Sequence, residues 1–240
     1  MKEKLYTIPV NDAFHTSCEC PICTMYHSLE ENAIDFTMGP SYMEDDIRET
    51  TNQQGFCEKH IGMLYKNQNR LGLSLMLSTH LKKTREDIEK LTKSGTTKSS
   101  GLFKKKASES PLTTYIKKVS QSCYVCDRID QVFKRYLITI LYLYKNDADF
   151  KKEFNASKGF CMPHYGMLYE LAASELSGAT YEAFIEDINQ LYLSNVKRVE
   201  DDLLWFIDKF DYRFANEPWK NSKDALPRSI EKLNSVLIEE

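Results

Sequence analysis

The chain has 240 residues, enough for one large domain or two small ones with a sizeable core. Its hydrophobic content of 42% and charged content of 28% are ordinary for a globular protein, and its net charge of −3 argues against a general nucleic-acid binder. With only 9 Gly and 7 Pro and long stretches of helical apolar spacing, the sequence predicts an all-α protein.

The N-terminal stretch MKEKLYTIPVNDAFHTSCEC has neither the apolar segment nor the small-residue cleavage site of a signal peptide. The most apolar run, YLITILYLY at 136–144, is less than half as long as a membrane span and predicts a buried helix. We therefore expect a cytoplasmic protein without a membrane span. In that reducing compartment, seven cysteines indicate metal binding or redox chemistry rather than disulfides.

A sequence repeat organises the chain. GFCEKHIGMLY at 55–65 returns as GFCMPHYGMLY at 159–169, and a Cys-x-x-Cys pair precedes each copy. This pattern predicts two related helical units, residues 1–92 and 112–210. The segment 93–111 is rich in Ser, Thr, Gly and Lys and predicts an exposed linker, and residues 211–240 form a tail.

Apolar spacing predicts the main helices in chain order. A weaker helix covers 69–91, and two stronger stripes follow the i, i+3, i+4, i+7 pattern. The first stripe is Ile129, Val132, Phe133, Tyr136, Leu137, Ile140 and Leu141; the second is Ile185, Ile188, Leu191, Tyr192, Val196, Val199, Leu203, Phe206, Ile207 and Phe210. In the tail, Tyr212, Phe214 and Trp219 are expected to dock onto the helices, and Pro227 lies in or interrupts a short final helix.

Each unit offers four metal ligands, the Cys3His set that is common at structural zinc sites. The eight ligands are Cys20, Cys23, Cys57, His60, Cys123, Cys126, Cys161 and His164. Proline and glycine beside them suit helix starts and tight turns. We expect two structural zinc ions, one per unit, although an exchange of half-sites between the units would use the same ligands. Iron–sulfur binding, dithiol redox chemistry and plain buried cysteines remain alternatives.

The seventh cysteine, Cys18, has no counterpart in the second unit, where Gln121 takes its place. It is either an alternative ligand or a free thiol, and we expect a free thiol.

An acidic segment between the half-sites of the first unit occurs only once. Its acids suit the N-terminus of a helix, where they interact favourably with the helix dipole. The sharper hypothesis is a pocket for a small ligand or a hard cation, formed by Glu44, Asp45, Asp46, Arg48, Asn52, Asn69, Arg70 and His80.

The chain resembles a bacterial family known only as a domain of unknown function. The resemblance rests on KEKLYTIPVNDAF, CPIC, GPSYMEDDIRETTNQQGFCEKH, NRLGLSLMLSTH, CYVC with GFCMPH, and KFDYRFANEPW. It covers nearly the whole chain outside the Lys-rich segment. It implies that the cysteine–histidine motifs and the acidic segment belong to one protein type. Some members bear an automatic label as ABC-transporter substrate-binding proteins, but the resemblance implies no established activity.

The leading hypothesis is a non-catalytic binding or adaptor protein whose partner is a protein or a small molecule. An enzyme would place its chemistry at Glu44–Arg48 with an additional hard metal, and a redox sensor would use the Cys-x-x-Cys thiols. A nucleic-acid binder would use the zinc sites together with Lys104, Lys105 and Lys106, and the net charge argues against it.

Overall fold

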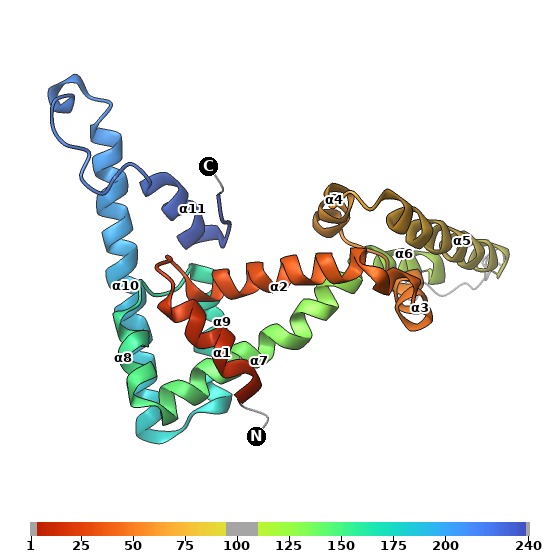
Figure 1. The fold of residues 1–240 in the computed structure, drawn as a ribbon, viewed down its shortest axis with the longest axis horizontal. Coiled ribbons are helices and arrows are strands. Elements are labelled where there is room, and N and C mark those ends of the chain that lie inside the picture. Colours follow the sequence, from red (N-terminus) through yellow and green to blue (C-terminus); the bar gives the residue numbers. More distant parts are fainter. Residues whose placement is uncertain (1–3, 95–109, 239–240) are drawn as a thin grey trace, which may run out of the picture. The chain divides into compact units, whose positions relative to one another are not determined.

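The computed structural model describes residues 4–94 and 110–238 (Figure 1). These residues form helices and contain no strand, which confirms the all-α prediction. The α-helices are α1 (Lys4–His15), α2 (Pro21–Met38), α3 (Asp45–Gln54), α4 (Glu58–Lys66), α5 (Arg70–Ser94), α6 (Pro111–Gln121), α7 (Tyr124–Asn146), α8 (Ala148–Ala156), α9 (Met162–Glu175), α10 (Gly178–Asp208) and α11 (Ala225–Asn234). The described residues also form two short 3-10 helices, η1 (Pro40–Met43) and η2 (Tyr212–Phe214).

One order of five α-helices occurs twice, as α1–α5 and as α6–α10. We call these the first half and the second half. In each half a leading helix is followed by one that begins at the Cys-x-x-Cys pair, a shorter helix, one that begins at the Cys-x-x-His pair, and a long helix. None of the helices in the described residues combines the length and apolar character that a membrane crossing needs.

The chain packs as two compact units that do not coincide with the two halves. Unit 1 combines the residues up to Ser28 with those from Val132 onward, and unit 2 is Leu29–Gln131. Both divisions fall inside continuous helices, one in α2 and the other in α7. Each unit therefore contains helices from both halves of the chain.

Unit 1 is built around buried aromatic rings. Phe14 on α1 lies 4.9 Å from Phe150 and 5.9 Å from Phe154 on α8, measured between ring centroids. Phe154 also lies 5.6 Å from Phe184 on α10. Buried aromatic pairs of this kind contribute about 0.5–1.5 kcal/mol each beyond the burial of their area. These contacts attach the first helix of the first half to α8 of the second half, and α8 in turn packs on α10.

Unit 2 has an aliphatic core. Leu64 on α4 and Met76 on α5 are fully buried, as is Val125 at the start of α7. Helix α6 packs on α5, where the Tyr115 hydroxyl donates a hydrogen bond to Asp87 at 3.2 Å. The leading helix of the second half therefore packs on the long helix of the first half.

The two strong helical stripes lie on α7 and α10. On α7, Ile129, Ile140 and Leu141 are at most 1% exposed, so the predicted buried face is present. Helix α10 runs for 31 residues and buries Ile188 and Leu191 among others. Its stripe is not buried throughout: Ile207 in the last turn is 58% exposed, and Phe210 lies after the end of the helix at Asp208 and is 76% exposed.

The tail packs on the last turns of α10, as expected for two of its three aromatic residues. Phe214 contacts Trp205 and Trp219 contacts Phe206, with ring centroids 5.7 and 5.9 Å apart. Tyr212 was expected to dock as well, but it is 88% exposed. The η2 turn directs its side chain to the surface.

The predicted linker at 93–111 is described only at its ends. Lys93 and Ser94 belong to α5, while Ser110 accepts a hydrogen bond from the Thr113 N–H and so caps α6. Residues 95–109, with the three consecutive lysines proposed for a nucleic-acid surface, lie outside the described residues. In the tail, Pro227 lies in the first turn of α11 and does not interrupt it, since a proline there costs no intrahelical hydrogen bond.

Candidate metal centres

The eight predicted ligands lie at the N-terminal ends of four helices. Cys57 and Cys161 are the residues immediately before α4 and α9, and each histidine follows in the first turn. The two Cys-x-x-Cys pairs occupy the corresponding positions on α2 and α7. Free N–H groups and the positive end of the helix dipole stabilise thiolates at such ends. The four short motifs therefore present their sulfurs and imidazoles in favourable local environments.

These ligands gather in two groups of four that exchange half-sites between the halves of the chain. Site 1 contains Cys20, Cys23, Cys161 and His164, and site 2 contains Cys57, His60, Cys123 and Cys126. In each group one ligand atom per residue lies within 4.8 Å of the others. The two Cys3His clusters are as predicted, but their composition corrects the expectation that each set forms within one sequence copy. The exchange follows from the packing of α1 on α8 and of α6 on α5.

The ligand atoms of site 1 lie close to the spacing of a tetrahedral metal ion, with the sulfur–nitrogen distances somewhat shorter than ideal. An ion bonded to thiolates at about 2.3 Å and to imidazole at about 2.0–2.1 Å places its sulfurs about 3.8 Å apart and its sulfur–nitrogen pairs about 3.6 Å apart. The Sγ atoms of Cys20 and Cys23 lie 3.8 and 3.6 Å from that of Cys161. The Nδ1 atom of His164 lies 3.1–3.5 Å from the three sulfurs. All four ligands are buried.

Site 2 has the same geometry but a more open position. The Nδ1 atom of His60 lies 3.3 Å from each of the three sulfurs, and the Sγ atoms of Cys57 and Cys126 are 3.9 Å apart. His60 and Cys123 are buried, whereas Cys57 and Cys126 are partly exposed. The chemistry of the two sites is therefore alike, and their access to solvent differs.

The crowding of thiols makes ionisation uneven. Burial raises the pKa of Cys20 to about 12, whereas contacts with the Cys20 and Cys23 thiols lower the pKa of Cys161. In site 2 burial raises the pKa of Cys126. Burial acts in the same direction on Cys123, but His60 and nearby backbone groups lower its pKa to about 6. One thiol of each site thus ionises readily, and a bound dication would favour the thiolate form of the others.

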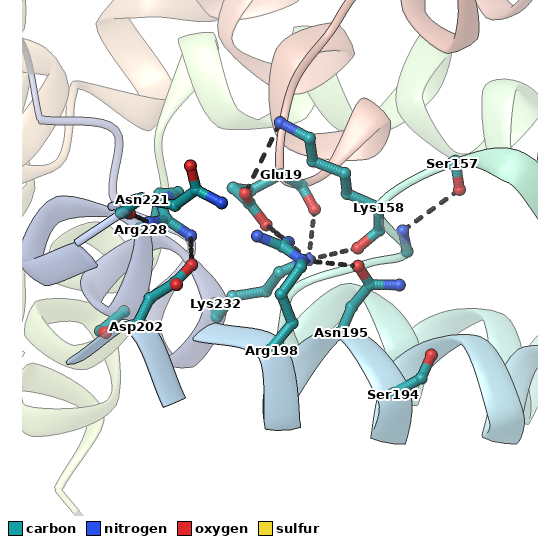
Figure 2. Close-up of polar contacts among 12 residues, drawn as sticks. Glu19, Ser157, Lys158, Ser194, Asn195, Arg198, Asp202, Asn221, Arg228 and Lys232 are labelled. Atoms are coloured by element: carbon teal, nitrogen blue, oxygen red, sulfur yellow. Dashed lines mark hydrogen bonds and ion pairs between the residues drawn. The ribbon is translucent and has the colours of Figure 1, made fainter. Parts of the chain in front are cut away.

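Lys232 on α11 joins the two loops that carry site 1 (Figure 2). Its Nζ donates to the backbone oxygens of Glu19 and Lys158 at 2.5 and 2.6 Å. Glu19 directly precedes the Cys-x-x-Cys pair, and Lys158 precedes the turn to the Cys-x-x-His pair. The Glu19 carboxylate lies 3.3 Å from the same Nζ and accepts a hydrogen bond from Arg198 at 2.5 Å. Because Glu19 and Lys232 are both buried, this network fixes the spacing of the two half-sites.

Glu30 on α2 supports the histidine of site 2. Its Oε1 lies 2.9 Å from the Nε2 of His60 and 2.5 Å from the Nζ of Lys59. A carboxylate at Nε2 fixes the tautomer that leaves Nδ1 free to bind a metal. Burial opposes ionisation of Glu30, but the contacts with His60 and Lys59 lower its pKa. In site 1 the His164 ring instead lies 5.6 Å from the Phe133 ring.

A glycine turn before each Cys-x-x-His pair has a positive φ, +64° at Gly55 and +74° at Gly159. At Gly55 a Cβ atom would lie 2.6 Å from Nε2 of His80. The His80 Nδ1 lies 2.8 Å from the Asn52 backbone oxygen, to which it donates when protonated. His80 therefore packs against the turn that carries Cys57, and only glycine fits at position 55.

The other residues of the predicted acidic pocket have separate local surroundings. Glu44, Asp45 and Asp46 are exposed at the start of α3, where they suit the helix dipole. The half-buried Arg48 lies one turn further along this helix.

The two pocket residues near α5 contact other groups. Asn69 donates from Nδ2 to the Met38 oxygen at 2.7 Å and accepts from the Gly72 N–H, while Arg70 lies 3.6 Å above the Tyr65 ring. Among the described residues, three or more metal-ligating side chains come together only in sites 1 and 2. Ligand binding by the acidic segment, and the enzyme built on it, therefore stay predictions.

Sequence patterns did not identify the residues that support the ligands. Glu30 and Lys232 are charged positions on otherwise buried helix faces, with Ala33 and Ile34 on α2 and with Ser229 on α11. On α2 that interruption of an apolar face is the one signal that could have found Glu30, whereas Lys232 shares its buried face with the polar Ser229 and has no such signal. Cys18 is partly buried and belongs to neither site, in keeping with a free thiol.

Comparisons with known proteins agree with the resemblance seen in the sequence. The model of a family described as "Family of unknown function (DUF6062)" matches residues 1–240. A search of curated proteins found no match, and a search of solved structures found none.

Proposed function

This chain belongs to the family of unknown function (DUF6062), and we propose that it is a non-catalytic zinc protein that binds a partner. The observation that carries the proposal is the pair of complete Cys3His sets. A catalytic zinc keeps one coordination position for water or substrate, whereas four protein ligands leave none. The binding energy of both ions then contributes to folding.

Zinc is the metal that suits these sites best. Three thiolates and one imidazole at tetrahedral spacing match structural zinc, and clusters of iron and sulfide use mainly cysteine. The test is metal analysis of the purified protein together with native mass spectrometry. We expect two zinc ions per chain; iron with acid-labile sulfide would contradict the assignment.

Cobalt substitution tests whether the sites are closed. The Co²⁺ protein is expected to show the intense visible bands of a tetrahedral thiolate site, and added azide should leave them unchanged. A spectral change that saturates with azide would mean an open coordination position, and would favour catalysis over a structural role.

Two four-residue variants test the exchange. Replacing all ligands of one exchanged site, Cys20, Cys23, Cys161 and His164, should remove one zinc ion. Replacing the four ligands of one sequence copy, Cys20, Cys23, Cys57 and His60, should remove both. Loss of both ions from the first variant and of one ion from the second would show that each site forms within one copy. Native mass spectrometry reads the stoichiometry directly.

The C-terminal end of α10 and the residues just after it support a binding role, because they present apolar side chains to solvent. Leu204, Ile207 and Phe210 are 52%, 58% and 76% exposed. Clustered exposed apolar residues are typical of surfaces that contact another protein. We place a protein partner at this surface. Leu193 lies on the same helix but outside this surface, so it provides a control position.

Affinity capture from cells of the source organism tests this surface. A protein identified by mass spectrometry should be retained by the parent chain and by Leu193→Asp, and lost from Phe210→Asp. Both variants should keep two zinc ions. Equal retention by Phe210→Asp would contradict the placement of the partner.

The partial exposure of residues Cys57 and Cys126 in site 2 supports a second candidate, thiol redox sensing. A thiolate of Cys57 or Cys126 would attack hydrogen peroxide and become a sulfenic acid as hydroxide leaves. A neighbouring thiolate would then displace a second hydroxide to form a disulfide, and the zinc ion would depart. Mild peroxide should release one zinc ion per chain; retention of both, or release of both at one rate, would contradict it.

A further inference from the structure

Both metal sites join the two halves of the chain. Site 1 combines the Cys-x-x-Cys pair of the first half with the Cys-x-x-His pair of the second, and site 2 combines the remaining two pairs. Each half therefore contributes two ligands to each of two sites. Neither half contains the four ligands of either observed site.

The exchange extends beyond the ligands. The leading helix α1 inserts Phe14 among Phe150, Phe154 and Phe160 of the second half, with centroid distances of 4.9–6.3 Å. Phe154 and Phe160 are fully buried. Helix α1 and the following Cys-x-x-Cys pair thus form an arm whose apolar and ligand contacts belong to the other half.

The second half places a corresponding arm on the first. The Tyr124 N–H donates to the Gly55 oxygen at 3.1 Å, and the Ser122 hydroxyl donates to the Gln54 oxygen at 2.6 Å. Both acceptors lie in the turn that leads to Cys57. These hydrogen bonds bring the arm α6 and Cys123 to the metal ligands of the first half.

We infer that neither half folds stably without the other. Two metal sites and two exchanged arms hold the halves together, and the chain link between α5 and α6 is not needed for this. The partner of each half is the matching five-helix unit. This inference rests on the proposed zinc sites. The covalent link raises the effective concentration of the halves, but it supplies none of the ligand or core contacts described above. Cutting it should leave a stable, zinc-dependent complex.

The experiment uses the full chain with a specific protease site inserted between Ser100 and Gly101. After cleavage, which a denaturing gel verifies, the two pieces should elute together by size exclusion, in equal amounts and with two zinc ions. Should the inserted site resist the protease, co-expression of residues 1–100 and 101–240 gives the same two pieces. Removal of zinc with a strong chelator should separate them.

Matched variants control for general effects on folding. Cys18→Ser changes the cysteine beside the arm that neither site uses, and the cut complex should keep its zinc and its size. Cys20→Ser with Cys23→Ser should lower the zinc count by one and weaken the cut complex at least tenfold.

Two results would overturn the inference: pieces that separate while zinc is bound, or pieces that each carry one zinc ion alone. Absence of zinc from the uncut chain would instead contradict the proposed function. The two failures are therefore distinguishable in the same preparation.

Discussion

Sites 1 and 2 have the same ligands in different surroundings. In site 1 all four ligands are buried. Lys232 donates hydrogen bonds to one backbone oxygen in each of the two loops that carry these ligands, and so joins the loops. In site 2 two of the three cysteines are partly exposed, and the main support is the Glu30 carboxylate, which contacts the ring of the ligand His60. One site is thus fixed through the backbone of its loops, and the other through the orientation of one ligand.

This difference indicates that identical ligand motifs can serve unequal roles. A buried site surrounded by an ion network loses its metal slowly, because chelators and oxidants cannot reach the sulfurs without local unfolding. A partly exposed site allows such reagents to approach. We therefore expect site 1 to stabilise unit 1, and site 2 to be the more readily exchanged.

The largest effect is expected from removal of a Cys-x-x-Cys pair. Cys20→Ser with Cys23→Ser should lose one zinc ion and lower the melting temperature more than Cys123→Ser with Cys126→Ser does. The reason for the difference is the burial of site 1. The reason for the large size of the effect is that zinc binding contributes about 10–16 kcal/mol to the folding of small zinc fingers. Circular dichroism melts with native mass spectrometry test it. Equal decreases in melting temperature for the two double variants would contradict the proposed difference between the sites. The single variant Cys126→Ser should remove about one zinc ion.

The second effect concerns the network around Lys232. Lys232→Met leaves the buried Glu19 carboxylate and two backbone oxygens without this donor, and should cost about 3–5 kcal/mol of unfolding free energy. The control is Lys197→Met on α10, whose ion pair with Asp201 is exposed, so that its loss should leave the unfolding free energy nearly unchanged. Urea denaturation provides the measurement. A Lys232 variant as stable as the control would show that site 1 does not depend on this network.

A smaller effect is expected at the carboxylate of site 2. Glu30→Ala should weaken zinc binding at this site by about 10–100-fold, because His60 loses the group that orients it. Competition with a coloured chelator should resolve one weakened site and one unchanged site. Glu30→Gln, whose amide oxygen still accepts a hydrogen bond, should recover part of the loss. A weakened site 1 instead would point to a general loss of folding.

The smallest effect is expected for Lys59, the other partner of Glu30. Its side chain is 59% exposed, so its ion pair should contribute less than about 1 kcal/mol. Lys59→Ala should therefore change zinc affinity at site 2 less than about fivefold in the same competition assay. A change as large as that of Glu30→Ala would mean that charge at Glu30, rather than its hydrogen bond to His60, controls the site.

Helices with complete apolar stripes were predictable from the sequence. Ile129, Ile140 and Leu141 lie on the buried face of α7 as their spacing indicates. The same rule failed for Phe210, which lies beyond the end of α10 and is 76% exposed. Periodicity predicts that a face is apolar, but the neighbours that cover it come from other parts of the chain.

By itself the sequence determined the ligand types, their spacing and their position at helix starts, because a Cys-x-x-Cys or Cys-x-x-His pair acts within one turn. It left open which pairs meet, since either combination supplies three cysteines and one histidine. Only the tertiary structure decided that Cys20 joins Cys161 and that Cys123 joins Cys57. The physical reason is the packing of α1 on α8 and of α6 on α5. Burial of those helix faces brings together ligand pairs about 140 residues apart in site 1 and fewer than seventy apart in site 2, a choice that local spacing does not encode.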